Sequence, residues 1–334
     1  MNHLHDRRLG SSALTLGSMG LGVAPLGNLY AQVSDADADA TLAGAERCDF
    51  SWFDVAPLYG YGRAEERLGR FLRRFGHAGK IVATKVGRVL EPAPSAQVHA
   101  HFVSPLQYRP VFDYSPAGIE RSYDESLRRL GLDRVQILLL HDIDRPHHPR
   151  RHRPVVKQLL DEALPTLHRL KADGRVDAIG LGIGEWDVGY EILANADIDC
   201  VLLAGRYTLL DQSAFTSGFL DACARRGVGV LAGGVFNSGF LAGGTTYDYH
   251  PASEELVKRR DHLSVLCHRY GVRLAAVALQ FSAAHPAIAS LVVGARSVEE
   301  TEAIMKWKRV VVPEDLWNSL RTDELIPLDA PVPA

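Results

Sequence analysis

Eight short apolar runs, each followed by a stretch with helical periodicity, constrain the fold of this 334-residue chain more than any other feature. The runs are almost continuously apolar, as strands are when both faces of a parallel sheet are buried. We expect strands at residues 16–21, 52–56, 81–86, 135–140, 178–183, 201–204, 228–232 and 291–293. This alternation predicts an α/β fold, either an eight-stranded barrel or a doubly wound sheet.

The intervals between the runs have helical periodicity, and one of them carries a complete set of helix signals. In the segment 116–130, Ser115 can act as the N-cap, Pro116 suits the first turn and Gly131 suits the C-terminal stop. We expect the other helices at residues 36–48, 64–74, 156–172, 186–194, 214–226, 254–270, 274–285 and 298–308. Apolar turns around Gly10 predict a small N-terminal β-hairpin, which could plug the lower end of a barrel.

Composition narrows the class of protein. The chain is 46% hydrophobic with a net charge of -3, so it can bury a large core and lacks the basic surface of nucleic-acid-binding proteins. We expect residues 1–334 to form a single domain. No stretch approaches the roughly 20 apolar residues of a membrane span, and the first residues lack the apolar segment of a signal peptide. The four cysteines are far apart without a C-x-x-C pair, which favours core thiols in a cytoplasmic protein.

Two segments are longer than ordinary connections between strand and helix. Residues 88–115 follow the third expected strand, and residues 141–154 follow the fourth. Both come after the C-terminal ends of strands, which form the active-site face of a barrel, so we expect them to build substrate walls. His99 and His101 have a ligand-like spacing but sit in mid-loop without further ligands, so we expect no metal. The basic run 147–153 predicts a solvated face.

Four polar residues stand at or just after the ends of apolar strands. Asp54 ends the second strand and Tyr59 follows five residues later, while Lys85 ends the third strand and His141 the fourth. In a barrel these side chains can converge on one cleft. A tyrosine has a pKa of about 10 and is a poor base at neutral pH, so we expect the Lys85 ammonium to lower the pKa of Tyr59. Asp54 could orient Lys85, and His141 could position a substrate oxygen during proton exchange.

Each of these residues has a simpler explanation when it is taken singly. Asp54 and Lys85 could form a structural ion pair. Tyr59 could be a packed loop aromatic, and His141 could be a buried histidine whose nitrogens are satisfied. Their coincidence at separate strand ends favours a shared site.

The residues around these positions resemble a known family. The stretch FDVAPLYGYGRAEERLG, which begins at Phe53, resembles the signature of the aldo-keto reductases, and the TK and LLHD sequences look like its lysine and histidine motifs. By this resemblance Asp54, Tyr59, Lys85 and His141 match the family's catalytic tetrad. The resemblance covers nearly the whole chain. It implies a (β/α)8 TIM barrel with an N-terminal β-hairpin and long loops at the C-terminal face, and it implies the use of NAD or NADP.

Two glycine-rich segments suit the phosphates of such a cofactor. Residues 231–239 follow the seventh strand and residues 292–300 the eighth, where barrels place phosphate sites, although simple turns would look the same. The GLGIGEW stretch that begins at Gly180 is not the G-x-G-x-x-G dinucleotide fingerprint. The resemblance implies that the cofactor is lined by Phe236, Ser238, Gly239, Gly294 and Arg296, and we expect Asn237 to contact it as well.

The chain departs from the family's usual pattern near the nicotinamide and the adenosine. Where many members have Ser-Asn, Gln and an aromatic residue, this chain has Gly182-Ile183, Ala204 and Gly233. Glu300 stands where members that prefer NADP often have an arginine. An acidic side chain would repel the 2′-phosphate of NADP and can accept a ribose hydroxyl, so Glu300 predicts NAD, with NADP left possible.

Further similarity points to a narrower subgroup. The stretches FVSPLQYRPVFDYS, from Phe102, and AGRYTLLDQ, from Ala204, resemble a subgroup that contains D-threo-aldose (L-fucose, L-galactose) 1-dehydrogenases and a pyridoxal 4-dehydrogenase. The resemblance implies oxidation of the anomeric carbon of an aldose of the L-fucose, L-galactose or D-arabinose type, or of a cyclic hemiacetal such as pyridoxal. The product would be a lactone, and hydride would pass to NAD. The expected pocket residues are Phe102, Gln107, Tyr108, Trp186 and Arg206.

Other functions fit parts of the same pattern. An NADPH-dependent reductase of aldehydes or ketones would run the same tetrad in the opposite direction. A non-catalytic nucleotide-binding regulatory subunit would use only the cofactor site, and a metal-dependent hydrolase would need more ligands than the histidine pair supplies. The expected partner is a small sugar or aldehyde, not a nucleic acid or a membrane, and we expect a monomer or small homo-oligomer.

Overall fold

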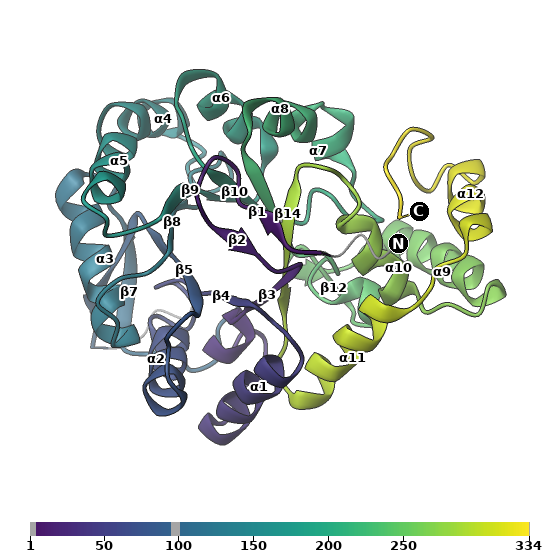
Figure 1. Ribbon diagram of the computed structural model, residues 1–334, viewed down its shortest axis with the longest axis horizontal. Helices are drawn as coiled ribbons and strands as arrows, with labels where there is room; N and C mark the ends of the chain where they lie inside the picture. Colours follow the sequence, from purple (N-terminus) through teal and green to yellow (C-terminus); the bar gives the residue numbers. More distant parts are fainter. Residues whose placement is uncertain (1–4, 95–100, 334) are drawn as a thin grey trace.

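Eight parallel strands close into a barrel in the computed structural model, which describes residues 5–94 and 101–333. In order round the barrel they are β3 (Met19–Gly22), β4 (Trp52–Asp54), β5 (Ile81–Val86), β8 (Ile137–His141), β9 (Ala178–Ile183), β10 (Cys200–Ala204), β11 (Gly229–Gly233) and β14 (Ile288–Gly294). Each neighbouring pair is parallel, and β14 returns to β3. The (β/α)8 barrel is therefore confirmed, and the doubly wound sheet is excluded (Figure 1).

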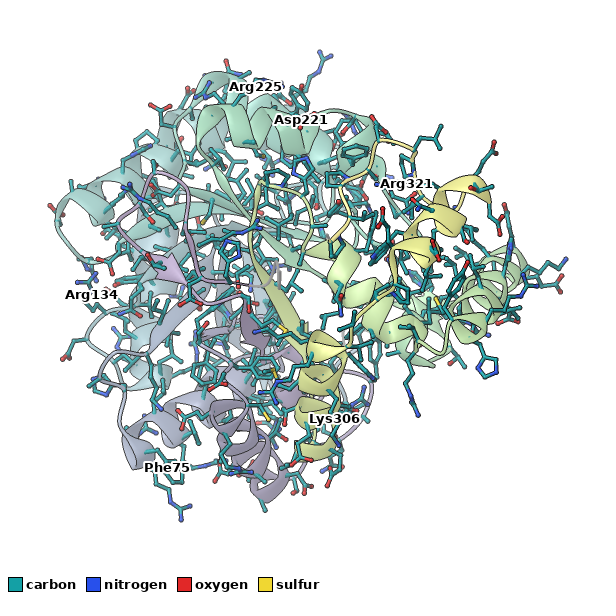
Figure 2. The ribbon with its side chains drawn as sticks, turned by 45° about the vertical axis from the view of Figure 1, so that its right-hand side comes forward. Phe75, Arg134, Asp221, Arg225, Lys306 and Arg321 are labelled. Carbon is teal, nitrogen blue, oxygen red and sulfur yellow. The ribbon has the colours of Figure 1, made fainter. Side chains whose placement is uncertain are left out.

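Helices cover the outside of the barrel (Figure 1). They are α1 (Asp35–Arg47), α2 (Arg63–Phe75), α3 (Pro116–Leu130), α4 (His152–Gln158), the π-helical turn η2 (Leu159–Ala163), α5 (Leu164–Ala172), α6 (Trp186–Asn195), α7 (Ser213–Thr216), α8 (Phe219–Arg226), α9 (Glu254–Arg269), α10 (Leu274–Ser282), α11 (Val298–Arg309) and α12 (Glu314–Thr322). Their outer faces carry charged side chains such as Arg225 and Lys306, which point away from the barrel (Figure 2). The α3 bounds match the expectation, because Ser115 accepts a bond from the Gly118 amide and Gly131 ends the helix.

Short elements close the two ends of the barrel. They are β1 (Arg7–Arg8), β2 (Thr15–Leu16), η1 (Ala24–Gly27), β6 (Arg88–Pro92), β7 (Tyr108–Phe112), η3 (Phe240–Ala242), β12 (Thr246–Tyr247) and β13 (His250–Pro251). The β1–β2 pair is the expected antiparallel hairpin. Its residues Leu9 and Leu16 are fully buried in one apolar cluster with Trp52 and Leu139, so the hairpin plugs the barrel (Figure 1).

Three expected boundaries are wrong for local reasons. The first barrel strand begins at Met19 because Leu16 pairs in the hairpin instead. The single helix expected at 214–226 is divided into α7 and α8 by Gly218, which has a φ of 76°. The helix expected at 156–172 begins at His152 and widens into a π turn just before Pro165, which has no N–H to donate to the preceding turn.

The two long segments follow β5 and β8. Residues 88–92 and 108–112 of the first pair as an antiparallel ribbon, β6 with β7, in which Arg88 lies opposite Phe112. The second leads into α4, and the run 147–153 is exposed as expected except for His148 and His152, which are buried. Both segments lie at the C-terminal ends of the strands, the end of the barrel opposite the hairpin.

Candidate active site

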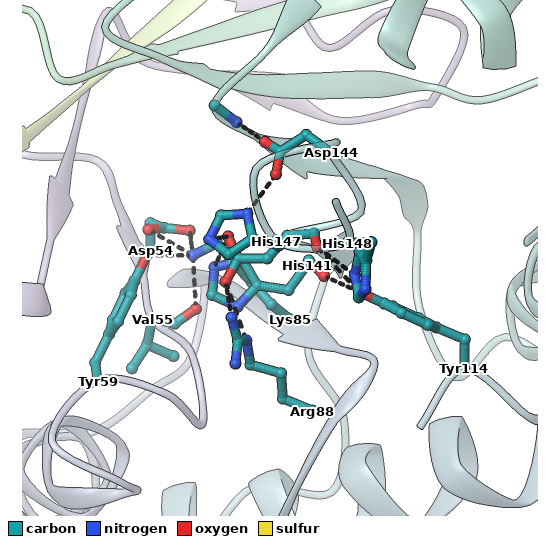
Figure 3. Close-up of polar contacts among 12 residues, drawn as sticks. Asp54, Val55, Tyr59, Lys85, Arg88, Tyr114, His141, Asp144, His147 and His148 are labelled. Carbon is teal, nitrogen blue, oxygen red and sulfur yellow. Dashed lines mark hydrogen bonds and ion pairs between the residues drawn. The ribbon is translucent and has the colours of Figure 1, made fainter. Parts of the chain in front are cut away.

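The ammonium of Lys85, on β5, connects three of the four residues singled out from the sequence. Its Nζ donates to the two carboxylate oxygens of Asp54 at 2.7 and 2.9 Å and to the hydroxyl of Tyr59 at 2.9 Å (Figure 3). It also lies 3.0 Å from the carbonyl of Val55. Lys85 is 1% exposed and Asp54 is 3% exposed, so the pair is buried with its charges matched. The structure thus brings these residues together at the mouth of the barrel.

Barrel register and one tight turn place these groups. Asp54 is the last residue of β4 and lies opposite Ala83 of β5, two residues before Lys85. Tyr59 follows in a turn against which η1 packs closely, since a Cβ added to Gly27 would stand 2.7 Å from the Tyr59 carbonyl carbon. The close approach of two backbones therefore fixes the position of the tyrosine.

The expectation that the Lys85 ammonium lowers the pKa of Tyr59 is wrong for the protein without cofactor. Burial raises the pKa of Tyr59 well above its usual value, and the Asp54 carboxylate raises it further. The negative charge of Asp54 offsets the positive charge of Lys85, so little field remains to favour the phenolate. Burial likewise raises the pKa of Asp54, although Lys85 opposes that shift. Tyr59 is therefore a phenol at neutral pH, able to donate a proton.

His141, the last residue of β8, lies beside the tyrosine as a neutral imidazole. The two rings are perpendicular, with their centroids 6.1 Å apart. Burial lowers the pKa of His141 to about 3, so it carries no charge at neutral pH. Its Nδ1 is buried without a hydrogen-bond partner in the described part of the chain. A neutral imidazole next to a phenol can hold a substrate oxygen without competing for the proton.

The segment that follows His141 is fastened by several polar contacts (Figure 3). The hydroxyl of Tyr114 donates to the carbonyls of His141 and Asp142 at 2.8 and 3.1 Å, and His148 also contacts the Asp142 carbonyl. Asp144 accepts a bond from the Gly184 amide at 2.7 Å and contacts the ring of His147. These bonds hold the backbone beside the catalytic candidates in one conformation.

The carboxylate of Asp142 is the most constrained group in this segment. Both hydrogen bonds that it receives from Arg88 go to Oδ2, at 2.7 and 3.0 Å, and the Arg88 guanidinium stacks 3.9 Å from the centroid of Phe112. Burial would raise the pKa of Asp142, but His141 and Arg88 hold that pKa well below its usual value. Sequence reasoning missed Asp142 and Arg88, although the quoted LLHD motif contains the aspartate.

The opposite side of the barrel mouth is open and rich in glycine. A Cβ added to Gly182 on β9 would meet the side chains of Lys85 and His141 at 3.3 and 3.7 Å. Asn237, in the loop after β11, is 1% exposed and its Oδ1 has no partner within the described residues. A flat ring could lie on the glycine, and a ligand amide or hydroxyl could bond the free oxygen, so these residues fit a nicotinamide nucleotide.

The other residues expected at the cofactor lie after β11 and at the junction of β14 with α11. Ser238 has a φ of 60° and accepts a bond from the Tyr249 amide, and Gly239 has a φ of 89°. Phe236 packs edge-on against Trp307. Gly294, Arg296 and Glu300 join β14 to α11: the Glu300 carboxylate accepts a 2.9 Å bond from the Arg296 amide and lies 3.5 Å from its guanidinium. The negative charge of Glu300 therefore offsets the positive charge of Arg296, one of the residues that the resemblance places at the cofactor.

Of the expected pocket residues, Phe102 is best placed. Its ring centroid is 6.3 Å from that of Tyr59, and it is 7% exposed. Trp186 starts α6 and is partly buried. Arg206 has other partners, since it bonds Glu185 at 2.8 Å and Asp248 at 2.7 Å, which leaves little of its guanidinium for a substrate.

Gln107 and Tyr108 lie at the start of β7, on the ribbon that borders the site. Of the histidine pair, His99 lies outside the described residues, and His101 contacts the ring of Tyr249. In residues 5–94 and 101–333, no cluster of His, Cys, Asp and Glu is arranged to hold a metal ion. None of the helices in that part of the chain is long and apolar enough to cross a membrane.

Solved structures share the architecture. The chain superposes on an aldo-keto reductase from Bacillus halodurans with a TM-score of 0.75 and 21% identity, covering 99% of this chain and 98% of the other. It superposes on a glycerol dehydrogenase from Gluconobacter oxydans with a TM-score of 0.75 and 19% identity over the whole of both chains. At this identity the likeness supports the fold alone.

Sequence comparisons identify relatives along the whole chain. It is 41% identical to pyridoxal 4-dehydrogenase of Microbacterium luteolum, covering 96% of this chain and 97% of that one. It is 36% identical to D-threo-aldose 1-dehydrogenase of Pseudomonas sp., covering 95% and 97%, and 31% identical to L-galactose dehydrogenase of Arabidopsis thaliana, covering 90% and 87%. The model of the aldo/keto reductase family matches residues 18–322. The chain belongs to the aldo/keto reductase family and is a nicotinamide-dependent oxidoreductase.

Proposed function

We propose that this protein oxidises a cyclic hemiacetal, the anomeric carbon of an aldose or pyridoxal, to a lactone, with NAD as hydride acceptor. The observation that carries the proposal is the bonding of Lys85 Nζ to both Asp54 and Tyr59, directly beside the neutral ring of His141. These groups surround one position where a hydroxyl can bond a proton acceptor and an imidazole together. The residues expected from the sequence supply all of them.

Tyr59 exchanges the proton in this scheme. The reacting hydroxyl bonds to Tyr59 Oη and to His141, and its proton passes to the tyrosine as the carbon gives up hydride. NAD would supply the hydride acceptor, and the positive charge of its ring would favour loss of the Tyr59 proton to solvent, which leaves the phenolate that takes the proton of the reacting hydroxyl. Lys85 holds the phenolate oxygen at 2.9 Å, and Asp54 holds Lys85. The Asp54 carboxylate keeps the free protein in the phenol state that a reaction in the reverse direction would need.

Residues at the opening after β11 and β14 would hold the cofactor. Asn237 offers its unpaired Oδ1, and the turn at Ser238 and Gly239 offers backbone amides to the phosphates. The helix α11 begins at Val298, shortly after Gly294, and its N-terminus adds its dipole. We propose NAD over NADP because the Glu300 carboxylate, which lies 3.5 Å from the Arg296 guanidinium, would repel a 2′-phosphate there.

The proposal of a hemiacetal substrate is supported by the relatives of this chain and by one aromatic side chain beside Tyr59. Pyridoxal 4-dehydrogenase and D-threo-aldose 1-dehydrogenase match almost the whole chain. Phe102, stacked near Tyr59, offers an apolar face to the C–H side of a sugar or to a pyridine ring. A reductase of aldehydes is the second candidate, because the raised pKa of Tyr59 suits proton donation to a carbonyl.

A substrate screen tests the proposal. The purified protein with NAD is offered L-fucose, D-arabinose, L-galactose and pyridoxal, and the absorbance of NADH is followed. We expect turnover of at least one of the four, with the lactone as product. Turnover of none of them, together with consumption of NADPH in the presence of aldehydes, would replace the proposal with the reductase. Nucleotide binding without any turnover would favour a regulatory subunit.

Oligomeric state, single-domain organisation and cytoplasmic location stay predictions.

A further inference from the structure

One carboxylate oxygen beside the catalytic candidates has no role in the scheme above. Asp142 accepts both hydrogen bonds from Arg88 through Oδ2. This leaves Oδ1 without a hydrogen bond in the described residues. Oδ1 lies 3.5 Å from His141 Nε2 and 3.8 Å from His147 Nε2. The Asp142 side chain is only 14% exposed. Because the side chain is mostly buried while Oδ1 makes no hydrogen bond to a described residue, this oxygen is available to a bound ligand.

The geometry around Asp142 is built to keep Oδ1 in place. The residue has a φ of 53°, a left-handed conformation that costs energy and is retained mostly at functional sites. Its amide donates to the Gly182 carbonyl at 3.0 Å, and its own carbonyl accepts from Tyr114. Arg88, stacked on Phe112, then locks the rotation of the carboxylate. The backbone and one carboxylate oxygen are fixed, and only the other oxygen faces the site.

The position of Oδ1 relative to His141 suggests what it binds. In the proposed function the reacting hydroxyl bonds to His141. Two oxygens on neighbouring carbons of a sugar are separated by little more than the length of a hydrogen bond. A carboxylate oxygen and an imidazole nitrogen 3.5 Å apart can therefore each reach one of them. Asp142 is ionised and can only accept, so it selects a group that donates, such as an alcohol.

We propose that Asp142 Oδ1, held in place by Arg88, accepts a hydrogen bond from the hydroxyl on the carbon next to the reacting carbon. This assignment rests on the proposed function and deepens it. It makes an aldose with a free 2-hydroxyl the preferred substrate class. Pyridoxal has no hydroxyl on the neighbouring carbon, so it gains nothing from this contact. The bond selects the substrate and takes no part in hydride or proton transfer.

A deoxy sugar and one isosteric variant test the proposal. The measurement is kcat/KM with NAD for L-galactose and for 2-deoxy-L-galactose. We expect the wild-type protein to prefer the sugar with the 2-hydroxyl by about 10- to 100-fold, as loss of a bond to a charged acceptor implies. In Asp142→Asn, Arg88 retains the amide oxygen, so the NH2 group faces the substrate and the acceptor is lost. We expect its preference to fall to within about threefold of unity, mainly through KM for L-galactose.

The variants separate this role from a purely structural one. Asparagine tolerates left-handed backbone well, so Asp142→Asn is expected to fold and to bind NAD as the wild type does. Glu91→Gln removes an exposed carboxylate from the same β6–β7 ribbon, where Glu91 pairs with Arg109, and serves as the control. If Asp142→Asn slows both sugars equally, Asp142 only orients His141 and the proposal is overturned. Asp142→Ala provides a second test of the same ratio.

The outcomes also distinguish this proposal from the function on which it rests. If the wild type oxidises both sugars equally well, hemiacetal oxidation stands and the role of Asp142 fails. If the wild type oxidises pyridoxal but neither sugar, the aldose assignment fails while the proposed function holds. If no hemiacetal is oxidised, the proposed function itself fails.

Discussion

The two sides of the barrel mouth are constructed differently. On the side of β4, β5 and β8, charged groups are buried and paired, with Lys85 bonded to Asp54 and Arg88 bonded to Asp142. On the side of β9, β10, β11 and β14, the last residues of three strands are Ala204, Gly233 and Gly294, and Gly182 stands next to the end of β9. The buried Oδ1 of Asn237 on this side lacks a partner among the described residues. The first side has its charged groups paired within the protein, whereas the second offers small residues and an unpaired amide oxygen to a ligand.

The difference matters because buried charges tolerate little change. Removing one partner of a buried ion pair costs about 3–5 kcal/mol, since the remaining charge is left without compensation. Glycine-rich strand ends have no such restraint and allow ligand contacts to vary between relatives. The sequence expectations divide in the same way, because the resemblance rests on the four residues of the first side and the expected departures, Gly182, Ala204 and Gly233, lie on the second.

The largest expected effect tests the first side through Tyr59. Tyr59→Phe keeps the ring against Phe102 and removes only the hydroxyl bonded to Lys85. We expect kcat to fall by roughly 10²- to 10⁴-fold, as loss of a general acid–base group does. NAD affinity, measured by calorimetry, is expected to stay within about twofold, because the cofactor would lie on the other side. Tyr190→Phe, on the exposed face of α6, is the control. Retained turnover would remove Tyr59 from its role.

A smaller effect concerns acid stability, again on the first side. The pKa of His141 is about 3 in the folded protein, and an unfolded histidine titrates near its model value of 6.5. The unfolded chain therefore binds the extra proton first as the pH falls, and stability is lost progressively from about 6.5 down to 3. We expect His141 to account for about 2 kcal/mol of lost unfolding free energy at pH 5.

Urea unfolding at pH 8 and at pH 5 measures this effect in the wild type and in His141→Asn. His148 and His285 have pKa values that burial lowers in the same direction, so the comparison between the two proteins isolates His141. The variant is expected to lose less stability on acidification. Equal losses in both proteins would show that the imidazole is not held neutral by burial.

The smallest expected effect tests the second side through Glu300. Glu300→Arg removes the carboxylate that pairs with Arg296 and leaves two guanidinium groups near the start of α11. We expect the ratio of kcat/KM for NADP to that for NAD to rise roughly tenfold, through bonds to the 2′-phosphate. Glu299→Arg makes the same charge change one residue earlier and is expected to shift the ratio less. An equal shift in both variants would indicate a general charge effect only.

Much of the fold could be predicted from the chain alone because its signals are local. The α3 bounds followed from Ser115, Pro116 and Gly131, which act within one turn of the helix ends. Leu16 could not be placed correctly, because an apolar residue suits a hairpin and a barrel strand equally well. The pairing with Arg7 shows that the hairpin, which the sequence predicted around Gly10, extends as far as Leu16.

The sequence by itself determined the alternation of strands and helices, and the resemblance of its motifs implied the barrel, the family and the four residues of the site. These signals are local, so they can be recognised without the folded chain. The tertiary structure decided the electrostatics. It showed that Asp54 cancels the field of Lys85 at Tyr59 and that Arg206 is already bonded to Glu185 and Asp248. It also brought Arg88 to Asp142 across two strands and left one oxygen free. Burial and the distance between charges set these properties, and both exist only when the chain is folded.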